Sequence, residues 1–203
     1  MAITTVVFDM GGVLIDFDAK RSLSTHFDTE YHNLINEKTF ASETWKLMDK
    51  GDIEVEEAIE IMCRDIPSEL HDEVKKMILD HEGEMPPIEE MYGIVKELKE
   101  KGYKIYLLSN CPMWFFDFKK CVPAFSFFDG FIVSAKYNLI KPGKEIYNVL
   151  FSEFSLEAPE CFFIDDSPAN IATAKELGMN AHCFSDKDFI KLRSALRDAG
   201  INI

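Results

Sequence analysis

The chain has 203 residues, a hydrophobic share of 47% and a formal net charge of −14. This length suits one domain with a modest insertion, and the hydrophobic share is ordinary for a chain that buries a core. The excess of acid argues against nucleic acid or an anionic membrane as a partner, because both would be repelled. It does not exclude an anionic substrate, because a bound cation can reverse the field inside one pocket.

Five cysteines stand apart, without a CxxC pair or the spacing of a zinc site. Scattered cysteines in odd number indicate reduced thiols. The amino terminus carries no basic region typical of a signal peptide, and no apolar run reaches the roughly 18–20 residues that span a bilayer. We therefore expect a cytoplasmic protein, without a membrane partner, that is a monomer or a homodimer.

The first predicted element is a buried strand at residues 2–8, which ends in Asp9 and a pair of glycines. Residues 19–81 are predicted to be helical, because apolar residues recur there at helical spacing. These stripes are Val55, Ala58, Ile59 and Met62, then Leu70, Val74, Met77 and Ile78. Residues 82–87, EGEMPP, contain a glycine and two prolines and predict a hinge with little to pack.

Strands and helices alternate after the hinge. An apolar stripe over residues 91–98 predicts a helix that ends before Gly102. The other predicted elements are strands at 103–109, 131–135 and 161–165, a helix with Pro142 as its first residue, a helix capped by Ser167 that stops at Gly178, and a last helix after 180–184. This alternation is typical of a parallel sheet with right-handed crossovers.

The sequence therefore predicts an α/β fold, with a Rossmann-like three-layer core around a parallel sheet and an inserted α-helical cap. We expect the core to be formed by residues 1–16 and 86–203. Residues 17–85 form the predicted cap, which covers one end of the sheet.

Polar residues follow the predicted strands at the edge where open α/β sheets bind ligands. They are Asp9, Ser109, Asn110, Lys141, Asp165 and Asp166. Singly, each fits a turn, a helix cap or a solvated side chain. Together they place three carboxylates, a hydroxyl, an amide and a cation at one edge. Because carboxylates repel one another, this grouping predicts a hard, oxygen-binding cation such as Mg²⁺.

A carboxylate such as Asp9 can attack phosphorus without a general base once the negative charge of the phosphate is neutralised. Lys141 and the metal would neutralise it. The Ser109 hydroxyl, the Asn110 amide and the backbone N–H groups of residues 10–12 would hold the phosphate oxygens. Glycines at positions 11 and 12 would let the backbone approach the phosphate closely.

Four segments, VVFDMGGVL, IYLLSN, LIKPGKEIY and FFIDDSPANIATAKELGM, resemble motifs I to IV of the haloacid dehalogenase-like hydrolase superfamily in type, order and spacing. The helical insertion resembles the family's C1 cap. The nearest subgroup includes α-D-glucose-1-phosphate phosphatase-like proteins and epoxide-hydrolase N-terminal phosphatase-like domains. The resemblance implies a Mg²⁺-dependent phosphatase that acts on a small phosphorylated metabolite through an aspartyl-phosphate, with hexose phosphates as the first expected substrates.

The resemblance also implies roles for particular residues. Asp9 would be the nucleophile and a metal ligand, while Ser109, Asn110 and Lys141 would bind the phosphoryl group. The other implied metal ligands are Asp166 directly, Asp165 through a water, and the Gly11 carbonyl, with Asn170 orienting the site.

One position departs from the family pattern. Family phosphatases usually carry an aspartate two residues after the nucleophile, as acid to the leaving group and base to the water, and here that position is Gly11. General acid–base help is worth roughly 10²–10⁴-fold. We therefore expect slower turnover, better leaving groups or another carboxylate. Asp16 and Asp18 lie just downstream.

Four other functions share part of this residue pattern. A metal-independent 2-haloacid dehalogenase also lacks that aspartate, but it lacks the metal-binding acid that IDDS retains. A phosphonoacetaldehyde hydrolase needs a cap lysine, for which Lys38, Lys46 and Lys50 are the candidates. A β-phosphoglucomutase-like mutase depends on the missing acid. A weakened phosphate-ester-binding or regulatory protein would not need a nucleophile.

Two aromatic segments could shape the substrate pocket or fill a core. Trp45 and Met48 lie three residues apart in the predicted cap. Trp114 and Phe115 begin an aromatic cluster just after SNCP. In both segments packing is the favoured interpretation, with a pocket wall as the alternative.

Overall fold

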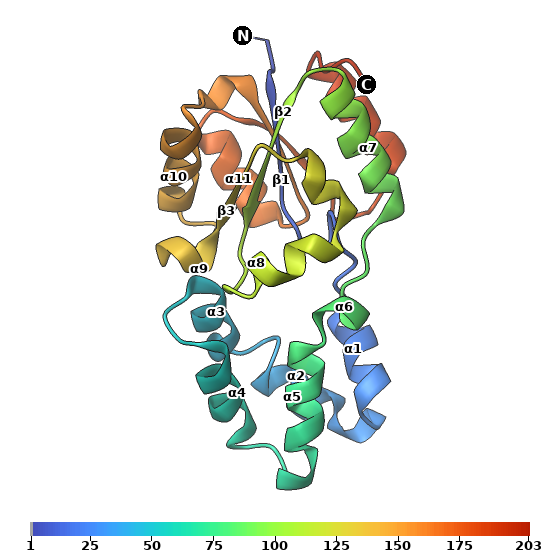
Figure 1. Ribbon diagram of the computed structural model, residues 1–203, viewed down its shortest axis with the longest axis vertical. Helices are drawn as coiled ribbons and strands as arrows, with labels where there is room; N and C mark the ends of the chain where they lie inside the picture. The colour runs from blue at the N-terminus through green and yellow to red at the C-terminus, as the bar shows by residue number, and fades with distance from the viewer. Residues whose placement is uncertain (1) are drawn as a thin grey trace.

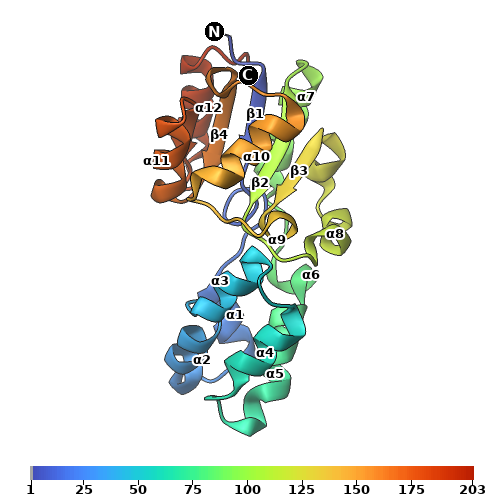
Figure 2. The ribbon, with the colours of Figure 1, turned by 90° about the vertical axis from the view of Figure 1, so that its left-hand side faces the viewer.

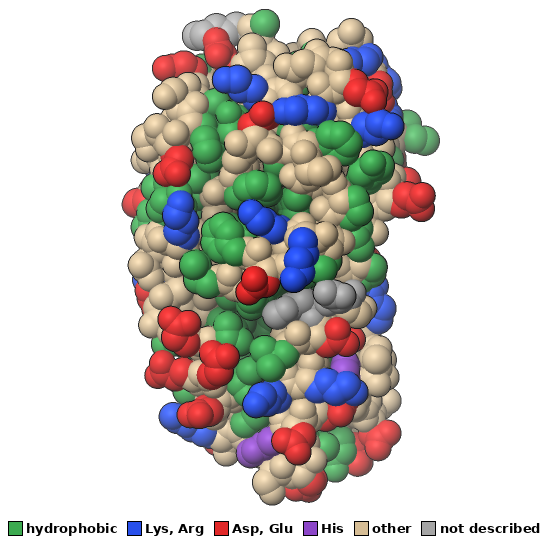
Figure 3. Space-filling view, viewed as in Figure 1, with side chains coloured by type: hydrophobic (Ala, Val, Ile, Leu, Met, Phe, Trp, Pro, Cys, Tyr) green, Lys and Arg blue, Asp and Glu red, His purple; other side chains and the backbone are tan. Residues whose placement is uncertain are grey.

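The computed structural model describes residues 2–203, apart from the side chains of His81 and Glu82. Met1, which begins the predicted 1–16 segment, and the Glu82 side chain of the predicted hinge lie outside the described residues. A sheet flanked by helices forms one half of the molecule and a group of helices forms the other (Figure 1). Acidic and basic side chains are interspersed on the face shown in Figure 3, and hydrophobic side chains reach the surface where the halves meet. Among the described residues, no helix has the length and apolar character needed to cross a membrane.

The strands are β1 (Thr5–Phe8), β2 (Lys104–Ser109), β3 (Gly130–Val133), β4 (Cys161–Asp165) and β5 (Asn180–Cys183). The helices of the helical half are α1 (Ala19–His26), α2 (His32–Lys38), α3 (Glu43–Lys50), α4 (Val55–Cys63), α5 (His71–Leu79) and α6 (His81–Glu84). Those around the sheet are α7 (Glu89–Glu100), α8 (Phe115–Phe118), α9 (Ser134–Tyr137), α10 (Lys144–Phe154), α11 (Pro168–Glu176) and α12 (Phe189–Asp198).

The five strands form one sheet in the order β3-β2-β1-β4-β5, and every neighbouring pair is parallel. β1 therefore lies at the centre, with Val6 opposite Ile105 of β2 and Phe162 of β4. The chain builds the sheet first on one side of β1 and then on the other. This reversal creates the crevice at which such sheets bind ligands.

Alternate strand residues are buried on opposite faces of the sheet. Val6 and Phe8 pack in one cluster with α7 and α12, whereas Val7 packs in another with α10 and α11. Helices thus cover both faces, as Figures 1 and 2 show. Burial on both faces explains why β4 reads as the continuous apolar run CFFI. The predicted α/β fold with a three-layer core is confirmed.

The helical half has an apolar cluster of its own. Its members come from α1 to α5 and their connections, and include Leu23, Ile35, Met48, Met62 and Val74. The chain passes between the two halves twice, and the two connecting segments lie side by side. The Asp16 N–H donates to the Pro86 carbonyl at 2.8 Å, and the Ile88 N–H donates to the Leu14 carbonyl at 2.9 Å. We propose that the two halves are a core, residues 1–16 and 86–203, and a cap, residues 17–85.

Two predicted boundaries near the site differ from the structure. The strand predicted at 131–135 ends at Val133, because the Ser134 hydroxyl accepts the Cys111 N–H at 2.7 Å and the chain turns into α9. The helix predicted to begin at Pro142 begins at Lys144 instead, with Gly143 as its N-cap. Lys141, before this helix, lies in a turn, and its backbone is held by the side-chain amide of Asn110.

The segment predicted to be a hinge is partly helical and well packed. It contains α6, and both Glu84 and Met85 are buried. The Glu84 carboxylate accepts a hydrogen bond from the Ser22 hydroxyl and lies 3.1 Å from His26 Nε2, while the other ring nitrogen of His26 lies 2.6 Å from Glu73. Glu84 therefore ties the second crossing to α1.

Replacing Glu84 by alanine should lower the free energy of unfolding by about 1–3 kcal/mol, because the buried Ser22 hydroxyl and one His26 nitrogen lose their partner. Urea unfolding measures this change. Glu73→Ala is the matched control, because its side chain is 38% exposed and should contribute less than about 1 kcal/mol. Equal losses in the two variants would contradict the importance assigned to Glu84.

Candidate active site

The carboxyl ends of three neighbouring strands bring the predicted site residues together. Asp9 directly follows β1, Ser109 is the last residue of β2, and Asp165 is the last residue of β4. Because β1 pairs in parallel with both β2 and β4, these three side chains meet at one edge. All three are at least nine-tenths buried.

Lys141 lies at the centre of this group and is 3% exposed. Its Nζ is 2.7 Å from Asp9 Oδ1 and 2.7 Å from Asp165 Oδ2, and it donates to the Leu108 carbonyl at 2.8 Å. An ammonium group has three N–H donors, so each has a partner here. Burial alone would lower the pKa of Lys141, but the two carboxylates raise it above its usual value. Lys141 is therefore a fixed positive charge.

The Asp9 carboxyl is destabilised as an anion. Burial raises its pKa to about 7, an effect that the neighbouring Lys141 opposes and that Asp165 and Asp166 reinforce. Near neutral pH one lysine thus does not balance the acids around it. A divalent cation among these carboxylates would favour the ionised, nucleophilic form of Asp9.

The two adjacent acids of β4 have different environments. Asp165 is fully buried and accepts hydrogen bonds from Lys141, from the Ser167 N–H at 2.8 Å and from Asn170 Nδ2 at 3.0 Å. Asp166 is half-buried, and burial together with the charge of Asp165 raises its pKa. Asp165 thus has protein partners that orient it, whereas Asp166 is the acid better placed to meet a cation.

The donor set fits a hard metal ion. Asp9, Asp165 and Asp166 each offer a carboxylate oxygen, and these oxygens lie within 4.8 Å of one another. Mg²⁺ binds carboxylate oxygens of this kind while keeping several waters. Asn170, expected to orient the site, does so through Asp165.

The two glycines after Asp9 differ in what surrounds them. Gly12 has φ +69°, and a Cβ there would lie 2.2 Å from Asp166 Oδ2. A Cβ on Gly11 would meet no atom within 4 Å. Gly12 is therefore required by the close approach of the Asp166 carboxylate, whereas Gly11 leaves open space.

The groups expected to hold phosphate are only partly available. Asn110 uses its amide to fix Lys141, with Oδ1 accepting the Lys141 N–H at 2.8 Å and Nδ2 donating to the Lys141 carbonyl at 3.0 Å. Of the backbone amides expected from residues 10–12, that of Gly12 donates to the Ile15 carbonyl at 2.9 Å. The structure thus gives Asn110 a role in positioning Lys141.

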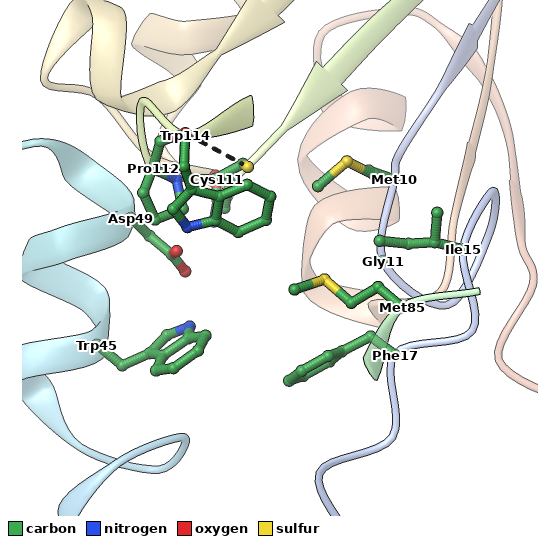
Figure 4. Close-up of a pocket in the computed structure, with 11 residues that line it drawn as sticks. Met10, Gly11, Ile15, Phe17, Trp45, Asp49, Met85, Cys111, Pro112 and Trp114 are labelled. Carbon is green, nitrogen blue, oxygen red and sulfur yellow. Dashed lines mark hydrogen bonds between the residues drawn. The ribbon is translucent and has the colours of Figure 1, made fainter. Parts of the chain in front are cut away.

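A cavity of about 180 Å³ opens beside the site, between core and cap (Figure 4). Its walls are mostly apolar and include Met10, Ile15, Phe17, Trp45, Met85 and Trp114. The Phe17 and Trp45 rings stack with their centroids 6.3 Å apart. Gly11, Asn110 and Asp49 supply the polar part of the wall.

Each aromatic segment singled out in the sequence divides between wall and core. Trp45 and Trp114 line the cavity. Met48 is 1% exposed within the cap cluster, and Phe115 is fully buried beside the sheet. Both tryptophans also pack against an apolar cluster, so each contributes to packing and to the cavity wall.

The two acids just downstream of Gly11 have partners away from the site. Asp16 lies 2.5 Å from Arg21 and 2.6 Å from Lys187, and Asp18 caps α1. Sequence reasoning missed Asp49, a cap carboxyl that lines the cavity. The sequence signal that marks it is an acid in the last turn of α3, a position that favours basic residues.

The three cap lysines form ion pairs with neighbouring acids. The partners are Asp65 for Lys38, Glu43 for Lys46 and Asp52 for Lys50. Nothing in these contacts marks one of them as a lysine prepared for Schiff-base chemistry.

Residues 3–178 match the sequence model of the haloacid dehalogenase-like hydrolases. The chain therefore belongs to this family of hydrolases, as its motifs predicted. A sesquiterpene phosphatase of Aspergillus oryzae is 28% identical over 180 residues, which cover 85% of each chain. A D-ribitol-5-phosphate phosphatase of Bacteroides thetaiotaomicron is 24% identical over 192 residues, covering 87% of this chain and 89% of that protein.

A solved structure shows the same fold. It is a HAD family enzyme from Bacteroides thetaiotaomicron in complex with magnesium and inorganic phosphate. It superimposes with a TM-score of 0.75 at 24% identity, over 94% of this chain and 99% of that one.

Gly12→Ala should weaken Mg²⁺ binding at least tenfold, because the new methyl group must displace the Asp166 carboxylate. A left-handed φ also costs a non-glycine residue roughly 1–2 kcal/mol. Titration calorimetry with MgCl₂ measures the affinity. Gly11→Ala is the matched control and should bind Mg²⁺ with an affinity within about twofold of the wild type, because its Cβ meets open space. Equal weakening in both variants would contradict this account of the two glycines.

Proposed function

We propose that the protein is a Mg²⁺-dependent phosphatase that hydrolyses small phosphate monoesters through an aspartyl-phosphate on Asp9. The observation that carries the proposal is the joint position of three carboxylates and one buried ammonium group. Lys141 contacts both Asp9 and Asp165 at 2.7 Å, and Asp166 completes a set of oxygens that can hold a cation. The names of the two phosphatase relatives point to the same chemistry.

Each residue of the set has a task in this reaction. Asp9 attacks phosphorus, while Lys141 fixes the Asp9 carboxylate and neutralises charge near the phosphoryl group. Ser109, at the end of β2, binds a phosphoryl oxygen. Asp9, Asp166 and the Gly11 carbonyl hold Mg²⁺, with Asp165 behind them. The bound ion supplies charge neutralisation, which lets an anionic carboxylate approach an anionic phosphate.

The walls of the cavity favour an apolar organic group. Two tryptophans, a phenylalanine and two methionines line it. A polyol enclosed there would lose hydrogen bonds to water, and the walls offer few partners to replace them. We therefore propose aryl or short prenyl monophosphates as the substrate class, in place of the hexose phosphates expected from the family resemblance. The small phosphorylated partner, the monomeric or dimeric state and the cytoplasmic location stay predictions.

The other functions become outcomes of one assay. The protein should hydrolyse 4-nitrophenyl phosphate with Mg²⁺, lose the activity in EDTA, and lose at least 10³-fold in Asp9→Asn, which cannot form the aspartyl-phosphate. Glu43→Gln, an exposed acid of the cap, should retain wild-type turnover. Metal-independent chloride release from 2-chloropropionate would instead support a dehalogenase. Phosphate-ester binding without hydrolysis would support a regulatory protein.

The same assay with different esters tests the substrate class. Values of kcat/KM for 1-naphthyl and geranyl monophosphates should exceed those for glucose 1-phosphate and ribitol 5-phosphate by at least tenfold, because burial of apolar area favours the first two. Trp45→Ala should reduce this preference, since Trp45 forms part of the wall. A preference for the sugar esters would contradict the proposed class while leaving the phosphatase activity intact.

A further inference from the structure

Asp49 occupies a position in the cap that faces the reaction site. It lies in the last turn of α3, and its carboxylate points into the cavity, across from Gly11 (Figure 4). Of the described residues that line this cavity, Asp49 is the only one with a carboxyl group. The cavity is where the organic part of a substrate would lie once its phosphate reached Asp9.

The environment of Asp49 favours the protonated form of its carboxyl group. Burial raises its pKa well above the usual range, and the charge of Asp9 adds to this rise. The hydrogen bond from Trp45 and the charge of Lys141 lower the pKa by less. A carboxyl whose pKa is raised in this way is suited to give a proton to a leaving group.

The core fixes the end of α3 that carries Asp49. The Ser134 hydroxyl donates to the Asp49 carbonyl, and Asn138 Nδ2 donates to the Gly51 carbonyl at 2.8 Å. Gly51 has φ +78° and lies so close to Ala135 that a Cβ would be 2.4 Å from its carbonyl oxygen. These contacts lock the cap helix onto α9 and hold Asp49 over the site.

We propose that Asp49 is the acid–base residue of this hydrolysis and does the work for which Gly11 has no side chain. This inference rests on the proposed phosphatase function. Asp9 attacks phosphorus, the bond between phosphorus and the ester oxygen breaks, and Asp49 gives its proton to the departing oxygen. Asp49, now a carboxylate, then takes a proton from the water that attacks the aspartyl-phosphate. Inorganic phosphate leaves, and both carboxyl groups return to their starting states.

The test is the dependence of kcat/KM on the leaving group, with Mg²⁺ present. In Asp49→Asn, kcat/KM for alkyl phosphates such as geranyl phosphate should fall by roughly 10²–10⁴-fold, because a poor leaving group needs the proton. For 4-nitrophenyl phosphate the loss should be at least tenfold smaller, because nitrophenolate departs without one. Asp52→Asn, an exposed neighbour beyond the end of α3, is the matched control and should give wild-type values for both esters.

Equal losses for both esters in Asp49→Asn would overturn the proposal, because a merely structural role reduces all rates alike. The absence of any loss would overturn it as well. The thermal midpoint of Asp49→Asn near neutral pH should equal or exceed that of the wild type, because a carboxyl whose pKa is raised in the folded state opposes folding there. This measurement separates a catalytic defect from misfolding.

A second variant tests whether position 11 can replace Asp49. Gly11→Asp in the Asp49→Asn background should recover at least tenfold of the alkyl phosphate activity, because a side chain at position 11 enters open space. If kcat/KM of the double variant depends on the leaving group as strongly as that of Asp49→Asn, the two positions are not equivalent. If the wild type hydrolyses neither ester, the phosphatase proposal fails, and this role of Asp49 fails with it. An active wild type combined with equal losses in Asp49→Asn overturns the role of Asp49 alone.

Discussion

The site depends on the ion pairs that the buried ammonium group of Lys141 forms with Asp9 and Asp165. Three carboxylates whose oxygens lie within 4.8 Å would repel one another if they were ionised without a cation between them. Lys141 lies 2.7 Å from two of them and gives its third proton to a backbone carbonyl. A buried charge is tolerated when all its donors have partners, and removing one side leaves the others unpaired. The register of the central strands and the hold of Asn110 on Lys141 both serve this one contact.

Much of the fold, and the site residues at the carboxyl edge of the sheet, can be predicted from the sequence. Parallel strands carry their carboxyl ends to one edge, so Asp9, Ser109 and Asp165 had to meet once their strands were recognised. Other features depend on contacts with distant residues. The strand predicted to include Ser134 ends before it, because the Ser134 hydroxyl accepts a hydrogen bond from the Cys111 N–H. Glu84 contacts Ser22 and His26, which lie about 60 residues earlier in the sequence. Local patterns do not contain such contacts.

Gly11 and Gly12 look equivalent in sequence, yet their surroundings impose different requirements. Gly12 makes room for an acid that follows β4, and its left-handed φ adds a second reason for glycine. Gly11 has free space, so its missing side chain is not a steric necessity. The unusual motif is thus compatible with catalysis if the proton comes from elsewhere. Asp16 and Asp18 are bound to other partners, and the source of the proton proposed above is Asp49 of the cap.

In the proposed reaction, core and cap have different tasks. The core would hold the phosphate and the nucleophile, while Trp45 and Asp49 of the cap line the cavity proposed for the organic group. Because the folded protein raises the pKa of Asp49, this acid costs stability near neutral pH, and such costs concentrate at functional sites. Asp49 belongs to the cap, and the contacts of the end of α3 with Ser134 and Asn138 hold it in the cavity wall that also contains Gly11 of the core. In the proposed reaction, proton transfer from Asp49 therefore depends on the contact between the end of α3 and α9.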